Sequence, residues 1–197
     1  VLGDQLDQSS AVFDGFDKDR DVVWMAEVAE ESTHVWTHKA RIVLFLSAMR
    51  HFRDHLVTKG FTVDYQEISE KKKPREPISL AEALKQSIHR FKQKGAKPDH
   101  LICVEPGEWR VRLALEEAAK KSGISLEVRP DRHFFTTVDD FSEHAAGRKQ
   151  LRLEFFYRPL RERFDVLMDN GEPTGGQWNY DADNRGSFGK SGPEKIK

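Results

Sequence analysis

The chain contains short runs of apolar residues, separated by longer segments that mix apolar and polar positions. Within these runs the apolar residues do not alternate strictly with polar ones, which is typical of strands buried on both faces of a parallel sheet. Val1 and Leu2 are expected to end one more strand of this kind, to which residues upstream of Val1 would belong. The other predicted strands cover residues 21–27, 61–68, 100–104 and 124–128.

Between the predicted strands, apolar residues recur at steps of three and four, the spacing of one buried helix face. In the longest of these segments Phe45 and Met49 share that face, and Gly60 stops the helix. Ser79, with a glutamate three residues later, is a typical helix amino-terminal cap. Helices are therefore predicted over residues 34–58, 79–94 and 106–121, the last with Pro106 in its first turn.

This alternation of strands and helices predicts an α/β fold, a Rossmann-like parallel sheet with helices on both faces. The alternation of strands and helices ends after residue 131, and helices are predicted over residues 139–146 and 151–168. A stretch rich in Gly and Ser follows at the carboxyl end. We expect an α/β domain over residues 1–130, a helical arm and linker over 131–185, and a flexible tail over 186–197.

Composition narrows the possible functions. The chain has 197 residues and a formal net charge of −1, so it lacks the strongly basic character of many nucleic-acid-binding domains. Its single cysteine, Cys103, excludes an internal disulfide, a four-cysteine zinc site and a four-thiolate iron–sulfur cluster within these residues. A single cysteine fits a reducing cytoplasm best, and we expect a monomer. We expect no membrane association, because apolar runs are far shorter than the ~18 residues of a membrane span.

Candidate ligand-binding residues follow three of the predicted strands. In an open parallel sheet, ligands bind beyond the carboxyl ends of the strands, where loops converge. Gly3 and Gly107 allow backbone to approach a ligand closely, and the nearby carboxylates accept hydrogen bonds from hydroxyl or amide groups. The candidates are Gly3, Asp4, Gln5, Glu27, Glu31, Glu105, Pro106, Gly107 and Glu108.

The chemistry of these segments favours a neutral, hydroxyl-rich or amide-rich ligand. The sequence contains neither Gly-x-Gly-x-x-Gly after a predicted strand nor Gly-x-x-x-x-Gly-Lys-Ser/Thr, the two glycine-rich signatures of nucleotide binding. An acidic lining also disfavours phosphate. An alternative stays open, in which the glycines only turn the chain and the acidic residues cap helices.

Two histidine pairs have a spacing of four residues, His34 with His38 and His51 with His55. We do not interpret either pair as a metal site, because no third ligand and no accompanying glutamate stand at a suitable spacing. His34 and His38 are instead expected near the ligand pocket, in the first turn of the long helix.

Basic residues gather between residues 147 and 164, where they are interleaved with aromatic residues. Such a segment can follow a nucleic-acid backbone. In the interpretation that we favour, an apolar stripe of Leu153, Phe156, Leu160 and Phe164 packs while the arginines stay in solvent. The basic residues are Arg148, Lys149, Arg152, Arg158, Arg161 and Arg163.

Several strings occur in a fixed order between the first residue and about Arg185. They include Leu2-Gly-Asp-Gln-Leu6, Phe45-Leu-Ser-Ala-Met-Arg-His-Phe52, Glu105-Pro-Gly-Glu-Trp-Arg110, Glu154-Phe-Phe-Tyr-Arg158 and Gly175-Gly-Gln-Trp-Asn-Tyr-Asp181. Together these strings resemble the deoxyribodipyrimidine photolyase-related proteins, which are bacterial iron–sulfur cryptochromes and (6-4) photolyases.

The resemblance implies a chain more than twice as long. In that family a helical carboxyl-terminal domain holds FAD and a cysteine-ligated 4Fe–4S cluster, and the whole enzyme repairs (6-4) pyrimidine adducts in damaged DNA. The amino-terminal domain carries an antenna, 6,7-dimethyl-8-ribityllumazine, and residues 105–108 would lie beside it. Matching positions place these residues near the antenna: Gly3, Asp4, Glu27, Glu31, His34 and Phe45. Relatives can carry a tyrosine at the position of His34 and an aliphatic residue at that of Phe45.

Two other functions remain compatible with the sequence. One is a cryptochrome-like blue-light photoreceptor without repair activity. The other is a stand-alone α/β domain that binds a small ligand.

Overall fold

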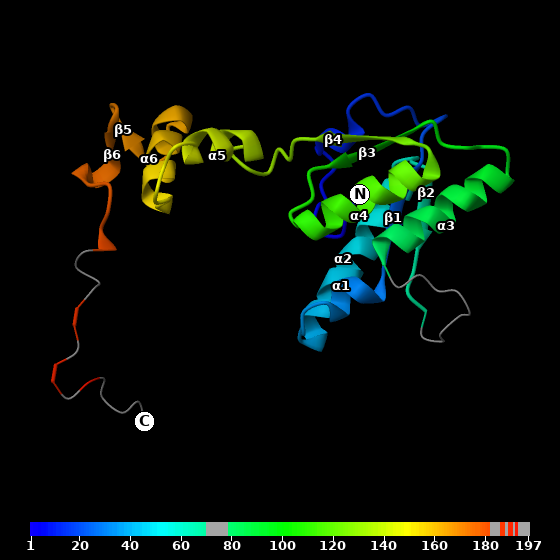
Figure 1. Ribbon diagram of the computed structural model, residues 1–197, viewed down its shortest axis with the longest axis horizontal. Coiled ribbons are helices and arrows are strands. Elements are labelled where there is room, and N and C mark those ends of the chain that lie inside the picture. Colours follow the sequence, from blue (N-terminus) through cyan, green and yellow to red (C-terminus); the bar gives the residue numbers. More distant parts are fainter. Residues whose placement is uncertain (70–78, 182–185, 188, 191, 193–197) are drawn as a thin grey trace. The chain divides into compact units, whose positions relative to one another are not determined.

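A computed structural model of the chain describes residues 1–69, 79–181, 186, 187, 189, 190 and 192 (Figure 1). Its backbone contacts separate two compact units, Val1–His133 and Phe134–Lys197. In the first unit, strands and helices alternate as the sequence predicts, and the fold is of the α/β class. Its elements are η1 (Ala11–Phe13), β1 (Val23–Ala26), α1 (Ala29–Thr33), α2 (Lys39–Thr58), β2 (Val63–Gln66), α3 (Leu80–Gln93), β3 (His100–Val104), α4 (Trp109–Ser122) and β4 (Ser125–Arg129).

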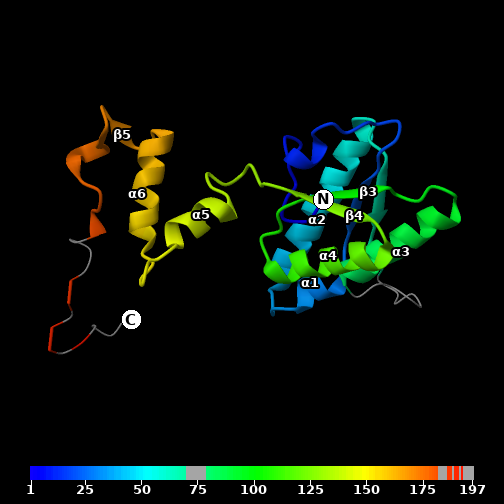
Figure 2. The same ribbon diagram turned by 45° about the horizontal axis from the view of Figure 1, so that its top comes forward.

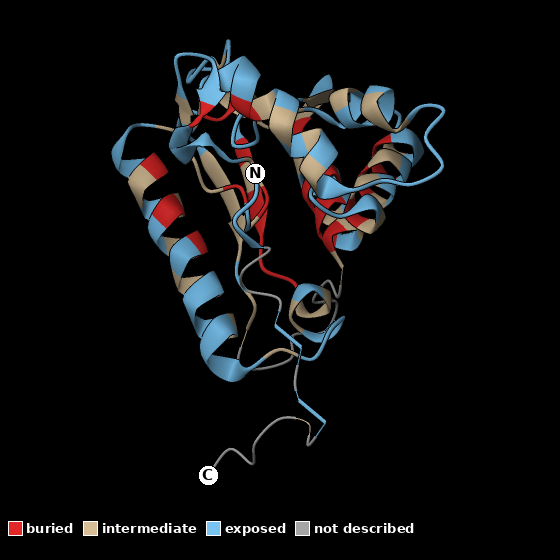
Figure 3. Ribbon diagram, turned by 90° about the vertical axis from the view of Figure 1, so that its left-hand side faces the viewer, coloured by how far each residue is buried: buried red, intermediate tan, exposed pale blue. Residues whose placement is uncertain are grey.

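Strand β1 pairs in parallel with β2 and is covered on both faces. Val23 and Met25 pack into a cluster with Met49, Phe52 and Leu56 of α2. The alternate side chains of β1 belong to a second cluster that α3 and α4 supply. Helices α3 and α4 lie side by side (Figures 1 and 2), and the buried residues of α2 lie along one side of the helix (Figure 3). The nearly unbroken apolar pattern of residues 21–27 thus reflects burial on two faces.

The strands form two parallel pairs instead of one continuous sheet. Strand β3 pairs with β4 in the same parallel manner as β1 with β2, and no ladder joins β1 to β3 within the described residues. Val1 and Leu2, predicted to end a strand, belong to neither pair. The amino group of Val1 donates to the Trp24 carbonyl oxygen of β1 at 2.9 Å.

Two helix starts differ from the sequence prediction. The helix expected from residue 34 is divided: His34 caps the end of α1, and α2 begins after His38, whose Nδ1 accepts a hydrogen bond from the Ala40 amide at 3.2 Å. Helix α4 begins at Trp109, so Pro106 lies in the preceding loop and not in the first turn. In both places a residue with extended backbone geometry precedes the first helical turn.

Helix α3 is held at its start and in its middle by polar contacts. Ser79 caps the helix as predicted, accepting from the Glu82 amide at 3.2 Å. The buried Ser87 hydroxyl accepts from Trp24 Nε1 of β1 at 3.1 Å and donates to Asp64 of β2 at 2.5 Å. These bonds fix α3 against both strands of the first pair.

The second unit is small and mainly helical. Phe156 of α6 contacts Phe141 of α5 edge-on, with ring centroids 5.4 Å apart, as expected for a packed apolar stripe. Leu153, assigned to the same stripe, is 80% exposed because it is the first residue of α6. The elements are α5 (Val138–Ala145), α6 (Leu153–Phe164), β5 (Met168–Asp169), β6 (Glu172–Pro173) and η2 (Thr174–Gly176).

Several arginines of α6 are engaged within this unit. Arg161, predicted to be solvated, is buried: its guanidinium donates to backbone carbonyls after α6 and lies 5.1 Å from the Trp178 ring centroid. Arg158 pairs with Glu154, and Arg163 pairs with Asp140 at 3.1 Å. These contacts favour the packing interpretation of this segment over nucleic-acid binding.

Two further predictions concern the carboxyl-terminal tail and association with a membrane. The tail expected over residues 186–197 lies largely outside the described residues. Among the described helices, none combines the length and apolar character that crossing a bilayer requires.

Candidate ligand-binding site

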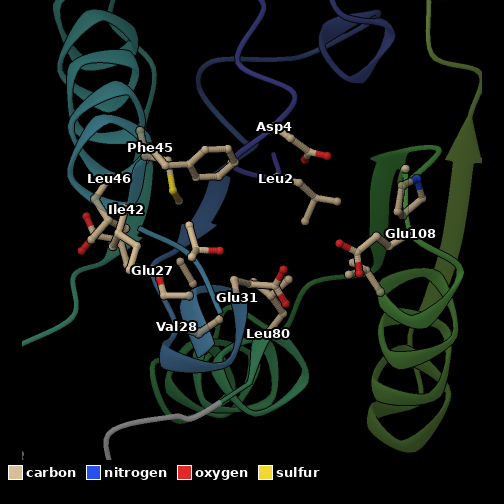
Figure 4. Close-up of a pocket in the computed structure, with 18 of the residues that line it drawn as sticks. Leu2, Asp4, Glu27, Val28, Glu31, Ile42, Phe45, Leu46, Leu80 and Glu108 are labelled. Atoms are coloured by element: carbon tan, nitrogen blue, oxygen red, sulfur yellow. The ribbon is translucent and has the colours of Figure 1, made fainter. Parts of the chain in front are cut away.

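A cavity of about 230 Å³ lies where the carboxyl ends of β1 and β3 meet the amino-terminal segment and the start of α2 (Figure 4). Three loops predicted to converge therefore contribute to one site. The predicted residues that line it are Gly3, Asp4, Glu27, Glu31, Phe45, Pro106, Gly107 and Glu108.

The other predicted site residues lie outside the cavity lining. Gln5 is buried and its Nε2 donates to the Glu105 carbonyl oxygen at 2.7 Å, which ties the first loop to the end of β3. The Glu105 carboxylate pairs with Arg112. His34 and His38 are exposed and serve as cap residues of α1 and α2. They do not lie on one face of a single helix, as their spacing predicts, because the helix is interrupted between them.

The Glu27 carboxylate is completely buried and accepts hydrogen bonds at both oxygens. Arg50 of α2 donates to both, at 2.7 and 2.8 Å. The Tyr65 hydroxyl of β2 donates to Oε1 at 2.6 Å, and the Ile68 amide donates to Oε2 at 3.0 Å. An ionised carboxylate has about four lone-pair positions, so these four bonds leave none for a ligand.

The same contacts keep Glu27 charged. Burial opposes ionisation, but the hydrogen bonds from Arg50, Tyr65 and Ile68 outweigh it and hold the pKa of the carboxyl below its usual value. Burial, reinforced by the bond to Glu27, raises the pKa of Tyr65, so its hydroxyl remains a donor. Glu27 therefore orders the wall of the cavity, while ligand contacts fall to other carboxylates.

Glu31 and Glu108 both line the cavity (Figure 4), and one guanidinium links their carboxylates. Arg110 Nη2 lies 3.0 Å from a carboxylate oxygen of each. Both carboxylates remain partly exposed, with side-chain accessibilities of 33% and 60%. A single arginine thus orients two acceptors and leaves each with lone pairs for a further donor.

Helix α2 supplies the apolar wall of the cavity. The close packing of this helix on the first loop depends on Gly3. A β-carbon placed on Gly3 would lie 2.7 Å from Phe45 Cε1 and 2.8 Å from Met49 Sδ, closer than van der Waals contact allows. The Phe45 ring points into the cavity (Figure 4). Glycine at position 3 is needed because α2 packs directly on the first loop.

Arg50, Tyr65 and Arg110 were not among the residues predicted for the site. Arg50 and Arg110 stand within the strings that carry the family resemblance, a signal that could have pointed to them. Tyr65 had no such signal, because a strand residue reaches a distant carboxylate only through strand pairing.

These groups suit binding better than catalysis. Carboxylate acceptors, a guanidinium and an apolar wall recognise a molecule that combines hydroxyl donors with an apolar ring. Cys103 does not contribute a nucleophile here, because it is buried in β3 and burial raises the pKa of its thiol to about 11.

Replacing Glu27 tests its structural role. We expect Glu27→Gln to lower the free energy of unfolding by about 1.5–3 kcal/mol at pH 7, because bonds to a buried charge are lost while Arg50 stays partly solvated. Urea unfolding measures this change. The matched control is Glu67→Gln, which removes an exposed partner of Arg53 and should cost less than about 1 kcal/mol.

The pH dependence of that difference has a definite sign. A carboxyl whose pKa is lowered on folding stabilises the protein at pH values above its pKa in the unfolded chain, which is 4.5 for Glu27. This stabilisation is lost as the pH falls through the lower pKa of the folded state. The gap between wild type and Glu27→Gln should therefore narrow below pH 4.5. An equal gap at pH 7 and pH 3 would contradict the assignment.

Comparison with known proteins agrees with the ordered strings. The family model described as deoxyribodipyrimidine photo-lyase-related protein matches residues 1–196. A (6-4) photolyase from Agrobacterium fabrum is 39% identical over 185 residues, which cover 94% of this chain and 35% of that protein. The uncharacterized protein R852 of Acanthamoeba polyphaga mimivirus is 22% identical over 160 residues, covering 79% of this chain and 73% of that protein. The chain belongs to the deoxyribodipyrimidine photo-lyase-related protein family.

Proposed function

We propose that this chain is the antenna-binding α/β domain of a light-driven photolyase-related flavoprotein, and that the cavity between β1, β3 and α2 takes 6,7-dimethyl-8-ribityllumazine. The observation that carries the proposal is the pairing of two oriented carboxylates, Glu31 and Glu108, with the apolar wall of α2 in one cavity. When bound, the lumazine would absorb light and pass the energy to a flavin.

The lining suits the chemistry of this ligand. Ribityl hydroxyls are donors that Glu31 and Glu108 accept, and the ligand carries no phosphate that the acidic rim would repel. The bicyclic ring would lie against Phe45 and Leu46, which line the cavity from α2. Glu27 would act indirectly, by holding the ends of β1 and β2 against α2.

The cavity is small for such a ligand. Its volume of about 230 Å³ is below the ~300–1,000 Å³ of typical small-molecule sites, and the Phe45 ring occupies part of the space that α2 leaves. Phe45 is 40% exposed, so solvent borders part of the residue. Phe45 would therefore have to change its rotamer when the ligand enters.

The first test removes one proposed acceptor. Glu31→Ala should weaken lumazine binding by about 10- to 150-fold, because a hydrogen bond to a charged acceptor contributes roughly 1.5–3 kcal/mol. Fluorescence titration of the lumazine into the purified chain measures the affinity. Glu30→Ala is the matched control: Glu30 also contacts Arg110, at 3.7 Å, but does not line the cavity.

Unchanged affinity in Glu31→Ala, in a chain that does bind, would remove Glu31 from the site. An equal loss in Glu30→Ala would assign the effect to the charge around Arg110 and not to direct acceptance by Glu31.

The second test concerns the size of the cavity. Phe45→Ala should strengthen lumazine binding several-fold, since it removes the ring that the ligand must displace. Leu44→Ala serves as control, because Leu44 lies on the same helix, is 71% exposed and does not line the cavity. Weaker binding in Phe45→Ala alone would show that the ring is a contact and not an obstruction.

The activity of the whole protein is a further proposal. The chain spans about a third of the Agrobacterium fabrum protein, which is named a (6-4) photolyase. We propose that the full-length protein repairs (6-4) pyrimidine photoproducts in DNA, with FAD and an iron–sulfur cluster held by a further domain outside residues 1–197. A cryptochrome-like photoreceptor is the alternative, and a light-dependent repair assay on the full-length protein separates the two.

Residues 1–197 expressed alone should neither retain flavin nor repair damaged DNA in light. Their one cysteine cannot supply the thiolates of a 4Fe–4S cluster. The absorption spectrum of the purified chain checks the first point, and lesion loss under blue light checks the second. A flavin band that survives gel filtration would overturn the expectation.

A further inference from the structure

The carboxylates that line the ligand cavity are only partly balanced by positive charge. Glu27 is neutralised by Arg50, which donates to both of its oxygens. Glu31 and Glu108 instead share one guanidinium, that of Arg110, at 3.0 Å each. Two carboxylates with one cation between them leave an excess of negative charge beside the cavity.

Two more acidic residues add to this excess. Glu30 of α1 approaches the same Arg110 guanidinium at 3.7 Å, so three carboxylates share it. Asp4 lines the cavity from the first loop (Figure 4), and its carboxylate pairs with no cation among the described residues. Arg41 lines the cavity from α2 and opposes this charge. The charged groups described in and around the lining are therefore five carboxylates and three guanidiniums.

A cavity of this kind disfavours a bound group that becomes negative. Like charges nearby and removal from water both oppose the ionisation of an acid, and each raises its pKa. The unbalanced carboxylates supply the first effect, and the apolar wall of Phe45 and Leu46 supplies the second. At an effective dielectric constant of ~20, one charge ~8–10 Å away shifts a pKa by roughly one unit.

The proposed ligand carries a group that such a cavity would affect. An 8-substituted lumazine is uncharged near neutral pH, and in mildly alkaline solution its 7-methyl group loses a proton to the solvent. The resulting anion absorbs at shorter wavelength than the neutral form, so it is a poorer absorber of blue light. The charge of the ligand therefore determines which light an antenna can collect.

We propose that the unbalanced carboxylates of the ligand cavity, those of Asp4, Glu31 and Glu108, hold bound lumazine in its neutral, blue-absorbing form at pH values where the free compound ionises. The role assigned to these residues rests on the proposed function, in which the lumazine is the ligand. Glu31 and Glu108 would act both as hydrogen-bond acceptors and as charges. Asp4 would act through its charge alone.

The experiment measures the pKa of the lumazine by absorption spectroscopy between pH 7 and pH 10, free and with a saturating amount of the chain. The bound pKa should lie about one unit or more above that of the free compound. Because the neutral form then binds preferentially, the dissociation constant should increase about tenfold across this range. Carboxylates and guanidiniums keep their charges there, and Tyr65 keeps its proton because its pKa is raised.

Two variants of opposite sign separate the effect of charge from that of burial. Asp4→Asn removes a negative charge and should lower the bound pKa by about half a unit. Arg41→Gln removes a positive charge and should raise the bound pKa by a similar amount. Glu117→Gln is the control and should leave the bound pKa unchanged, because Glu117 pairs with Lys121 on α4 and does not line the cavity.

A bound pKa equal to or below that of the free lumazine would overturn the proposal and leave the proposed function intact. A raised pKa that is identical in Asp4→Asn and Arg41→Gln would also overturn it, since burial alone would then explain the shift. Failure of the lumazine to bind at pH 7 would instead contradict the proposed function, and this proposal would fall with it.

Discussion

The buried carboxylate of Glu27 holds together the parts of the first unit that shape the ligand cavity. It stands directly after β1 and accepts from α2, from β2 and from the segment after β2. A buried carboxylate is stable only when its oxygens are paired, so this residue requires α2 and β2 to keep fixed positions. Gly3 can then bring the first loop against α2, and residues of both line the cavity.

The acceptors of the cavity are organised around a different arginine. Arg110 at the start of α4 draws Glu31 and Glu108 toward one point, while α2 presents an apolar surface opposite them. Because the carboxylates outnumber the guanidinium, the site favours hydroxyl and amide donors over anions. All lone pairs of the Glu27 carboxylate are occupied, so Glu27 supports the cavity, whereas the partly exposed Glu31 is a proposed contact of the ligand.

Much of this molecule follows from local sequence pattern. Apolar runs determined β1, β2, β3 and β4, spacing of three and four determined the helices, and Ser79 marked the start of α3. The ordered strings determined the family, which the match over residues 1–196 confirms.

The tertiary structure decided what depends on contacts between distant residues. Glu31 and Arg110 meet across 79 residues of chain, and Gln5 meets Glu105 across 100, so no local period reports either contact. His34 and His38 lie outside the cavity lining, contrary to the prediction, because they cap two separate helices. Arg161 is buried and not solvated, because it packs against the Trp178 ring. Hydrophobic periodicity specifies which face of an element is buried, whereas the partners of a polar side chain are set by packing of elements far apart in sequence.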